Sequence, residues 1–204
     1  MKIGIVGAGL MGAKLGTLWA RAGHDVVFSY ARDLKKLAKL GTPATVTEAA
    51  QRDVVLLAVN WDRIDDVLAQ AGPLAGKTVI TTCLAMKDGA PLFGADWSAT
   101  EELTKRLPRA RVVAAFGTIP SECLFGVYAG RKKAARPSLL HYGAKVPAAV
   151  RLIKDLGFDP IDAGDASVGR TAEAFTLLVA HLAYERPGGA GLTYTFARHR
   201  ELKR

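Results

Sequence analysis

The most constraining feature of this chain is a glycine-rich turn that directly follows its first apolar run. Residues 2–6 read Lys-Ile-Gly-Ile-Val, residues 7–12 read Gly-Ala-Gly-Leu-Met-Gly, and a helical pattern covers residues 10–22. A strand, a G-x-G-x-x-G turn and a helix in this order begin a βαβ unit, whose helix N-terminus offers free amides to a pyrophosphate. We therefore expect a dinucleotide to bind at Gly7, Gly9, Leu10, Met11 and Gly12.

Apolar runs of strand length alternate with longer amphipathic stretches along the rest of the chain. Strands are expected over residues 2–6, 25–29, 53–59, 78–82, 111–116, 138–142 and 158–162. Helices are expected over residues 10–22, 33–40, 62–71, 98–107, 147–156 and 167–184, with Ser98 and Glu101 as a capping box. This alternation predicts the α/β class, with a doubly wound, mostly parallel sheet of the Rossmann type.

Residues 117–137 show little periodicity, so we expect a long loop that can close over a site. We interpret residues 1–204 as a single domain with a short helical C-terminal extension. Within it, we expect residues 1–116 to form the dinucleotide-binding core, and residues 117–204 to form a loop on the acceptor side and the C-terminal extension.

The composition excludes several classes of protein. Half of the 204 residues are hydrophobic and 23% are charged, an ordinary globular profile. The longest apolar stretch, residues 54–59, is far shorter than the roughly 20 residues that cross a bilayer. The chain has no leader-like segment, and Cys83 and Cys123 lack metal-ligand spacing. We therefore predict a cytoplasmic protein without a membrane span or a metal site.

The chain is basic, with 28 Lys and Arg residues against 19 Asp and Glu residues and a net charge of +9. Such a charge attracts anionic partners. The basic clusters are scattered and no nucleic-acid-binding motif accompanies them, so nucleic acid is a disfavoured partner and a solvated surface is the simpler interpretation.

The end of the second predicted strand indicates which dinucleotide binds. An NAD site places a carboxylate there, whereas this chain reads Ser29-Tyr30-Ala31-Arg32. Arg32 and the Ser29 hydroxyl can hold a 2′-phosphate, and Lys36 lies one helical turn onward. We therefore predict NADP(H) as the cofactor, although Asp33 would reverse the preference if it faced the ribose.

The next predicted strand ends at the same edge of the sheet, where open α/β sheets place their ligand. Its last residues and the one that follows are therefore further candidates for cofactor binding: Ala58, Val59 and Asn60.

Several segments together resemble one family, the NADPH-dependent reductases of the deazaflavin coenzyme F420. They are the glycine turn, residues 29–32, 53–59 with Trp61, Phe116 with Thr118 and Ile119, 156–164 and 181–184. The resemblance covers nearly the whole chain. It implies hydride transfer between NADP(H) and a small planar acceptor, coenzyme F420 or a flavin, commonly in a homodimer.

Three positions depart from this family's pattern. Asn60 stands where members usually carry Pro, Gly117 stands where they carry Asn, and Thr82-Cys83-Leu84 replaces Thr-Asn-Pro. A redox sensor that binds NADP(H) without turnover is therefore an alternative. Reductases of 3-hydroxy acids or imines share the amino-terminal fold but add a large helical domain, and only about forty residues follow Asp162 here.

His181 is the candidate catalytic residue, because an imidazole beside a reduced acceptor can donate a proton or a hydrogen bond at neutral pH. A packing or interface role is the alternative, since residues 174–184 are strongly apolar. We expect both cysteines to be small buried side chains, and Trp61 to pack beside the cofactor cleft.

Overall fold

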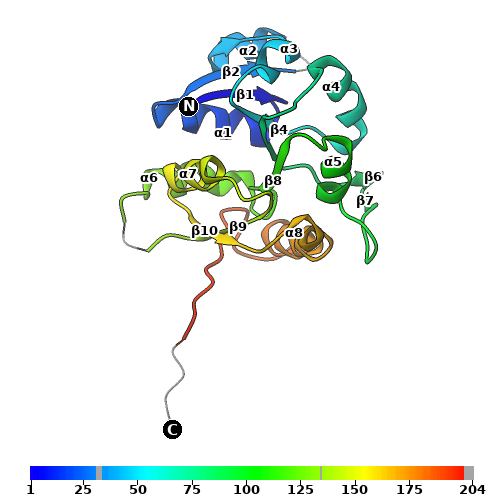
Figure 1. Cartoon of the computed structure of the whole chain (residues 1–204). Helices are drawn as coiled ribbons and strands as arrows, with labels where there is room; N and C mark the ends of the chain where they lie inside the picture. Colours follow the sequence, from blue (N-terminus) through cyan, green and yellow to red (C-terminus); the bar gives the residue numbers. More distant parts are fainter. Residues whose placement is uncertain (31–33, 134, 200–204) are drawn as a thin grey trace.

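The computed structural model describes residues 1–30, 34–133 and 135–199 of the chain. Its strands form an eight-stranded sheet in the order β10-β9-β8-β5-β4-β1-β2-β3 (Figure 1). The strands are β1 (Lys2–Val6), β2 (Asp25–Ser29), β3 (Thr42–Pro43), β4 (Val54–Leu57), β5 (Thr78–Thr81), β8 (Arg111–Ala115), β9 (Ser138–Gly143) and β10 (Asp159–Asp162). All neighbouring pairs are parallel except β8 and β9, which confirms the predicted doubly wound, mostly parallel sheet.

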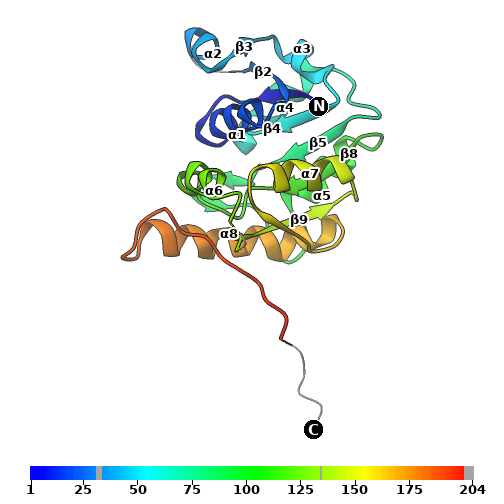
Figure 2. The same ribbon diagram turned by 90° about the vertical axis from the view of Figure 1, so that its left-hand side faces the viewer.

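Helices cover both faces of this sheet. They are α1 (Leu10–Arg21), α2 (Leu34–Leu40), α3 (Val46–Ala50), α4 (Ile64–Ala71), α5 (Ala99–Arg106), α6 (Leu124–Ala129), α7 (Pro147–Asp155) and α8 (Gly169–Tyr184). Short 3₁₀ turns are η1 (Trp61–Arg63), η2 (Ser121–Cys123) and η3 (Ala166–Val168), and β6 (Met86–Lys87) pairs with β7 (Ala90–Pro91) in a small hairpin. Figure 2 shows α1, α6 and α7 side by side on one face.

Alternation along the strands divides the core between the two faces. Ile3 and Ile5 of β1 join the cluster under α1, α6 and α7, whereas Val6 joins the cluster under α3, α4 and α5. Trp19 of α1 lies at the centre of the first cluster and donates a hydrogen bond from Nε1 to the carbonyl oxygen of Leu152 at 3.1 Å. The edge of Phe116 packs against Trp19, so α1, β8 and α7 share one close-packed interior.

The expectation of a long loop over residues 117–137 was wrong. This segment contains η2 and α6, and Cys123, Leu124 and Tyr128 are buried against α1. Its six-residue helix is too short to show a clear 3.6-residue period, which explains why the sequence pattern missed it.

The predicted capping box at Ser98 is incomplete, and a complete one occurs at another helix. At α5, Ser98 accepts a hydrogen bond from the Glu101 amide, but the Glu101 carboxylate bonds the Ser98 hydroxyl and Arg170 instead of closing the box. A complete capping box occurs at α3, between Thr45 and Glu48. No helical pattern in the sequence indicated that helix, which has only five residues.

The segment after α8 turns at Gly188 and Gly189 and returns along β9 (Figure 1). We call residues 192–197 the strap. The Ser138 amide donates to the Tyr194 carbonyl oxygen at 2.8 Å, and the Phe196 amide donates to the Ser138 hydroxyl oxygen at 3.0 Å. Of the helices in the described parts of the chain, none is long and apolar enough to cross a membrane.

Candidate functional site

The glycine turn between β1 and α1 is held by contacts that only glycine permits. Gly7 has a φ of +108°, and a Cβ there would collide with the carbonyl oxygen of Ala58. A Cβ on Gly12 would collide with the carbonyl oxygen of Gly7. The Gly7 amide donates to the Ser29 carbonyl oxygen at 3.1 Å, which ties the turn to the end of β2. The turn is therefore fixed by backbone packing.

The first turn of α1 faces open space. Gly9 is the N-cap and provides no side-chain cap, and no acidic residue lies in the first turn. A Cβ at Gly9 would meet nothing within 4 Å, and Leu10 is 73% exposed. Met11 is half-buried and packs against the core. Unpaired amides at the positive end of a helix dipole suit an anion, so this turn fits the pyrophosphate of a dinucleotide.

The end of β2 differs from the predicted phosphate site at one residue. Ser29 is fully buried, and its hydroxyl donates to the Ile5 carbonyl oxygen at 2.8 Å. In this structure, therefore, its side chain is turned toward the sheet and not toward the ligand edge. Arg32 and Asp33 lie outside the described residues, and Lys36 is exposed on α2. The 2′-phosphate prediction thus depends on Arg32 and Lys36.

Tyr30 links β2 to α4 at this edge. It adopts a left-handed backbone with a φ of 56°, and its hydroxyl donates to Asp66 Oδ2 at 2.6 Å. Burial and the neighbouring Asp66 carboxylate raise the pKa of Tyr30, and the Tyr30 hydrogen bond lowers the pKa of Asp66. Non-glycine residues with a positive φ are uncommon and gather at functional sites.

A cavity of about 550 Å³ opens beside Tyr30. Residues from the end of β2, from α2 and β3, from the start of α3 and from the end of α4 line it: Tyr30, Leu37, Pro43, Ala44, Thr45, Val46, Glu48 and Gln70. No local sequence pattern indicated this cavity, because it depends on where α3 lies. Its position beside the glycine turn suits the adenosine part of a dinucleotide.

The carboxyl end of β4 lies against the glycine turn. The Ala58 amide donates to the Val6 carbonyl oxygen at 2.9 Å, Ala58 and Val59 are half-buried, and Asn60 is exposed. The Cys83 thiol lies behind them and contacts the Leu57 and Val59 carbonyl oxygens. These three candidate residues therefore share one edge with Gly7 and Gly12.

The cysteines and Trp61 have packing roles. Burial raises the pKa of the Cys83 thiol, and burial raises that of Cys123 to about 11, so both stay protonated near neutral pH. Trp61 packs against Trp97 and under the Arg106 guanidinium, which lies 5.7 Å from its ring centre.

A small, nearly filled pocket with a free volume of about 10 Å³ lies at the carboxyl ends of β5 and β8. Its lining includes Cys83 and Gly117, two of the three positions that depart from the family pattern. Phe116, directly before Gly117, has a φ of 66° and is fully buried. The pocket has space for about one water molecule.

Glu173 of α8 is a buried carboxylate in the lining of this pocket. Its oxygens accept hydrogen bonds from the Ala99 amide at 3.0 Å and the Thr100 amide at 3.1 Å, at the N-terminus of α5. Burial raises the pKa of Glu173, and these hydrogen bonds act in the opposite direction. The sequence analysis above does not predict this role. The signal that could have indicated it is an acidic residue, Glu173, in a helix whose neighbouring residues are mostly apolar.

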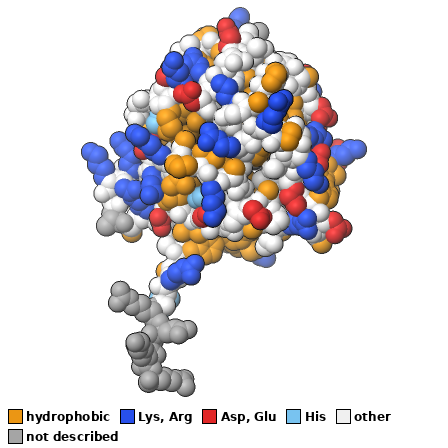
Figure 3. Space-filling model, in the orientation of Figure 1, with side chains coloured by type: hydrophobic (Ala, Val, Ile, Leu, Met, Phe, Trp, Pro, Cys, Tyr) orange, Lys and Arg blue, Asp and Glu red, His pale blue; other side chains and the backbone are white. Residues whose placement is uncertain are grey.

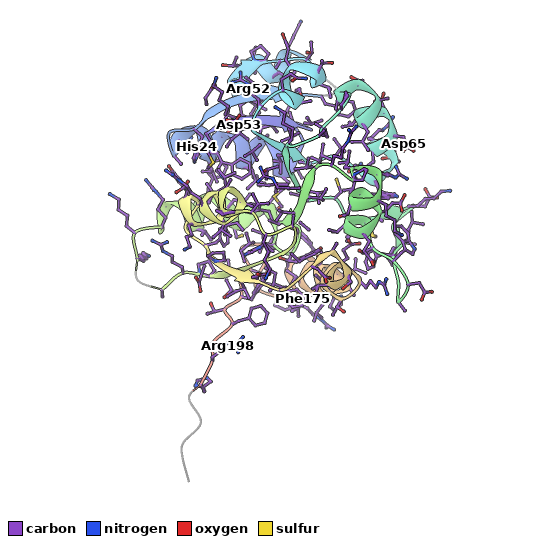
Figure 4. The ribbon with its side chains drawn as sticks, in the orientation of Figure 1. His24, Arg52, Asp53, Asp65, Phe175 and Arg198 are labelled. Carbon is purple, nitrogen blue, oxygen red and sulfur yellow. The ribbon has the colours of Figure 1, made fainter. Side chains whose placement is uncertain are left out.

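Tyr194 of the strap contacts two residues that line this pocket, Thr118 and Leu140. Its hydroxyl lies 2.7 Å from Thr118 Oγ1 and accepts a hydrogen bond from the Leu140 amide at 3.3 Å. Phe175, labelled on α8 in Figure 4, packs edge-on against the Tyr194 ring. The strap thus joins α8 to the segment after β8, a contact that no local sequence pattern indicates.

His181 does not line this pocket. Its Nδ1 lies 2.8 Å from Glu185, its Nε2 accepts a hydrogen bond from Arg186, and its side chain is 41% exposed. A polar chain nearby connects α1, η2 and α8: Lys14 donates to Ser121 at 2.9 Å, and Tyr184 donates to Glu122 at 3.0 Å. His181 therefore belongs to the exposed end of α8.

Comparisons with known proteins relate part of this chain to a family of reductases. Residues 2–84 match the sequence model of the family described as NADP oxidoreductase, coenzyme F420-dependent. No curated protein sequence matches the chain. A crystal structure named "putative F420 dependent NADP-reductase", from Arthrobacter sp. FB24, is 25% identical with a TM-score of 0.81, over 97% of this chain and 100% of that one.

Two further solved structures share the fold. A hypothetical protein from Sinorhizobium meliloti is 24% identical with a TM-score of 0.73, over 97% of both chains. A reductive aminase from Aspergillus terreus, in complex with NADPH4, cyclohexanone and allyl amine, is 19% identical with a TM-score of 0.66. The match covers 88% of this chain but only 60% of the aminase. The resemblance to the F420-dependent NADP oxidoreductases is therefore confirmed over residues 2–84, and the comparisons support an NADP-dependent oxidoreductase.

Proposed function

We propose that this protein transfers a hydride between NADP(H) and a planar acceptor, either coenzyme F420 or a flavin-like molecule. The observation that carries the proposal is that the uncapped start of α1 and the pocket at the ends of β5 and β8 open on one edge of the sheet. A dinucleotide whose phosphates lie at Gly9 extends along this edge toward Cys83. The name of the Arthrobacter protein agrees with this acceptor class.

The chain's own contribution is alignment and electrostatics. Amides of the glycine turn would hold the pyrophosphate, Arg32 and Lys36 the 2′-phosphate, and Ala58, Val59 and Asn60 would line the path between the two ends. When bound, NADPH supplies the hydride itself. The nearly filled pocket, with Glu173 held in its wall and Thr118 held by Tyr194, would then offer a firm surface against which the acceptor lies.

The cofactor part is tested by calorimetry with NADPH and NADH. We expect the wild-type chain to prefer NADPH, and Arg32→Ala to weaken NADPH about tenfold while leaving NADH unchanged, since a charge-assisted bond is worth roughly 1.5–3 kcal/mol. Lys39→Ala removes an exposed lysine from α2, the helix that carries Lys36, and is the control. Equal affinity of the wild-type chain for both cofactors would contradict the proposal.

The acceptor part is tested by turnover. Oxidation of NADPH should proceed with coenzyme F420 or with FMN in steady state. If NADPH binds tightly but neither acceptor oxidises it, the protein is a redox sensor and the enzymatic proposal fails. Because the binding and turnover measurements are separate, the two failures are distinguishable.

We also propose a cytoplasmic homodimer. Leu178 and Leu182 are 53% and 44% exposed on α8, a helix face that a second copy of the chain would cover. Sedimentation equilibrium of the wild-type chain measures the state directly, and a monomer at micromolar concentration would contradict it.

A further inference from the structure

A second cavity, of about 630 Å³, opens between β9, α7 and the end of β10. Because β9 runs antiparallel to β8, the end of β9 lies beside the start of β8, where the Ala144 amide bonds the Val112 carbonyl oxygen. This is the edge of the sheet opposite to the glycine turn. The cavity is therefore separate from the site described above.

His141 of β9 lies in the lining of this cavity and is only 9% exposed. Side chains alternate along a strand, and Leu139 packs in the cluster of α7 while Tyr142 packs toward α8. His141 therefore faces α7 and the cavity, on the same side as Leu139. Within residues 1–30, 34–133 and 135–199, its ring makes no hydrogen bond, and no side-chain nitrogen or oxygen that is sealed from solvent lacks a partner. Its ring nitrogens are therefore open to the cavity.

The helix beside His141 begins without a cap. Val146 provides no side-chain hydrogen bond to the first turn of α7, Pro147 is the first helical residue, and no acidic residue lies in that turn. Pro147 has no amide proton, and the Ala149 and Val150 amides bond the Val146 carbonyl oxygen, so this helix end offers a negative charge its dipole and the Ala148 amide. Val146 and Pro147 both line the cavity, so this end of α7 faces the same space as His141.

Basic side chains dominate the rim. Lys145, Arg151 and Lys154 line the cavity, and Figure 3 shows Lys and Arg side chains among hydrophobic ones over the region of α7. The two acidic lining residues already have partners: Asp162 accepts from the Gly164 amide at 2.9 Å, and Asp155 lies 3.0 Å from His24 and 3.8 Å from Arg151. The inner walls are apolar, through Ala144, Val146, Pro147 and Val150.

We propose that this cavity binds a small organic carboxylate with an apolar body, whose carboxylate meets His141, the start of α7 and the basic rim. Apolar walls with a few convergent polar groups are the usual composition of such a site. The proposal is independent of the NADP(H) site and predicts the same affinity with and without NADPH.

The test is a titration of the protein with benzoate, followed by NMR of the ring carbons of its four histidines. We expect the His141 signal to move and saturate with a Kd on the order of 1 mM, as suits a fragment of this size, and the His181 signal to stay in place. His141→Leu should weaken benzoate about tenfold, measured by calorimetry, because it removes the buried donor.

Rim variants keep the test decisive if His141→Leu does not fold. Lys154→Gln and Arg151→Gln should each weaken benzoate about threefold, whereas Lys132→Gln, an exposed lysine outside the cavity, should change nothing. An unmoved His141 signal would overturn the proposal. So would inorganic phosphate binding as well as benzoate, because the apolar walls would then contribute nothing.

Discussion

The side of the site that we propose holds the cofactor and the side that we propose faces the acceptor are held by different kinds of contact. On the cofactor side, backbone packs against backbone: Gly12 lies on the Gly7 carbonyl oxygen within a turn of six residues, and Gly7 lies on the Ala58 carbonyl oxygen at the end of β4. On the acceptor side, Glu173 reaches Ala99 across 74 residues of sequence, and Tyr194 reaches Thr118 across 76. The first side depends on close approach of the backbone, and the second is an assembly of distant side chains.

This difference explains where the family resemblance is measurable. The family model matches residues 2–84, the part that contains the glycine turn and the end of β4. Local backbone constraints leave few residue choices, since a Cβ at Gly7 or Gly12 would collide with a carbonyl oxygen. Side-chain assemblies tolerate many combinations, so the acceptor side changes sequence more freely on the same fold.

The largest expected effect comes from a substitution in the glycine turn on the cofactor side. Gly12→Ala should lower the free energy of unfolding by about 3 kcal/mol and abolish NADPH binding, because the added Cβ meets the Gly7 carbonyl oxygen. Chemical denaturation and calorimetry measure the two quantities. Gly9→Ala is the matched control: its Cβ enters open space, so stability should change by less than about 1 kcal/mol while NADPH affinity falls. Equal destabilisation by both variants would show that packing does not hold the turn.

The second prediction concerns the long-range side. Glu173→Ala should lower the free energy of unfolding by about 2 kcal/mol, because the Ala99 and Thr100 amides lose their buried acceptor. Hydrogen exchange should accelerate at these two amides and not in α1. A variant as stable as the wild-type chain would show that this carboxylate does not hold α5 to α8.

The same residue predicts a pH dependence. Burial raises the pKa of Glu173 above its ordinary value of 4.5, so the folded chain holds this proton more tightly than the unfolded chain. Its contribution to stability is therefore fully present below pH 4.5 and is lost as pH rises through the raised pKa. Glu173→Gln cannot titrate and should lack this loss when unfolding is measured as a function of pH. Parallel curves for the two proteins would contradict the assignment.

The smallest effect separates the strap from the sheet. Tyr194→Phe removes the hydroxyl that bonds Thr118 and the Leu140 amide, and should cost about 1 kcal/mol. Because the aromatic packing on Phe175 remains, the chain should stay folded, with faster hydrogen exchange confined to the strap and the start of β9. Faster exchange throughout the sheet would mean that the strap supports the whole fold and not only the acceptor side.

Sequence patterns predicted most helices and strands, because these elements are long enough for the hydrophobic period to repeat. The strands of the sheet interior and the helices α1, α7 and α8 lie within about two residues of expectation. The patterns failed at α3 and α6, which have five and six residues, too few to repeat a helical period. They also placed the Ser29 hydroxyl at the ligand edge, whereas burial and the Ile5 carbonyl oxygen hold it inside.

The amino-acid sequence by itself determined the class of fold and the place of the glycine turn. Both follow from local rules, namely the alternation of apolar runs and the G-x-G-x-x-G turn, in which a Cβ at Gly12 would meet the Gly7 carbonyl oxygen. Only the tertiary structure decided that Glu173 and Thr118 wall one pocket with Tyr194 bonded to Thr118, and that His141 faces a second cavity beside α7. Contacts between residues more than seventy positions apart depend on how whole layers pack, and no local pattern encodes that packing.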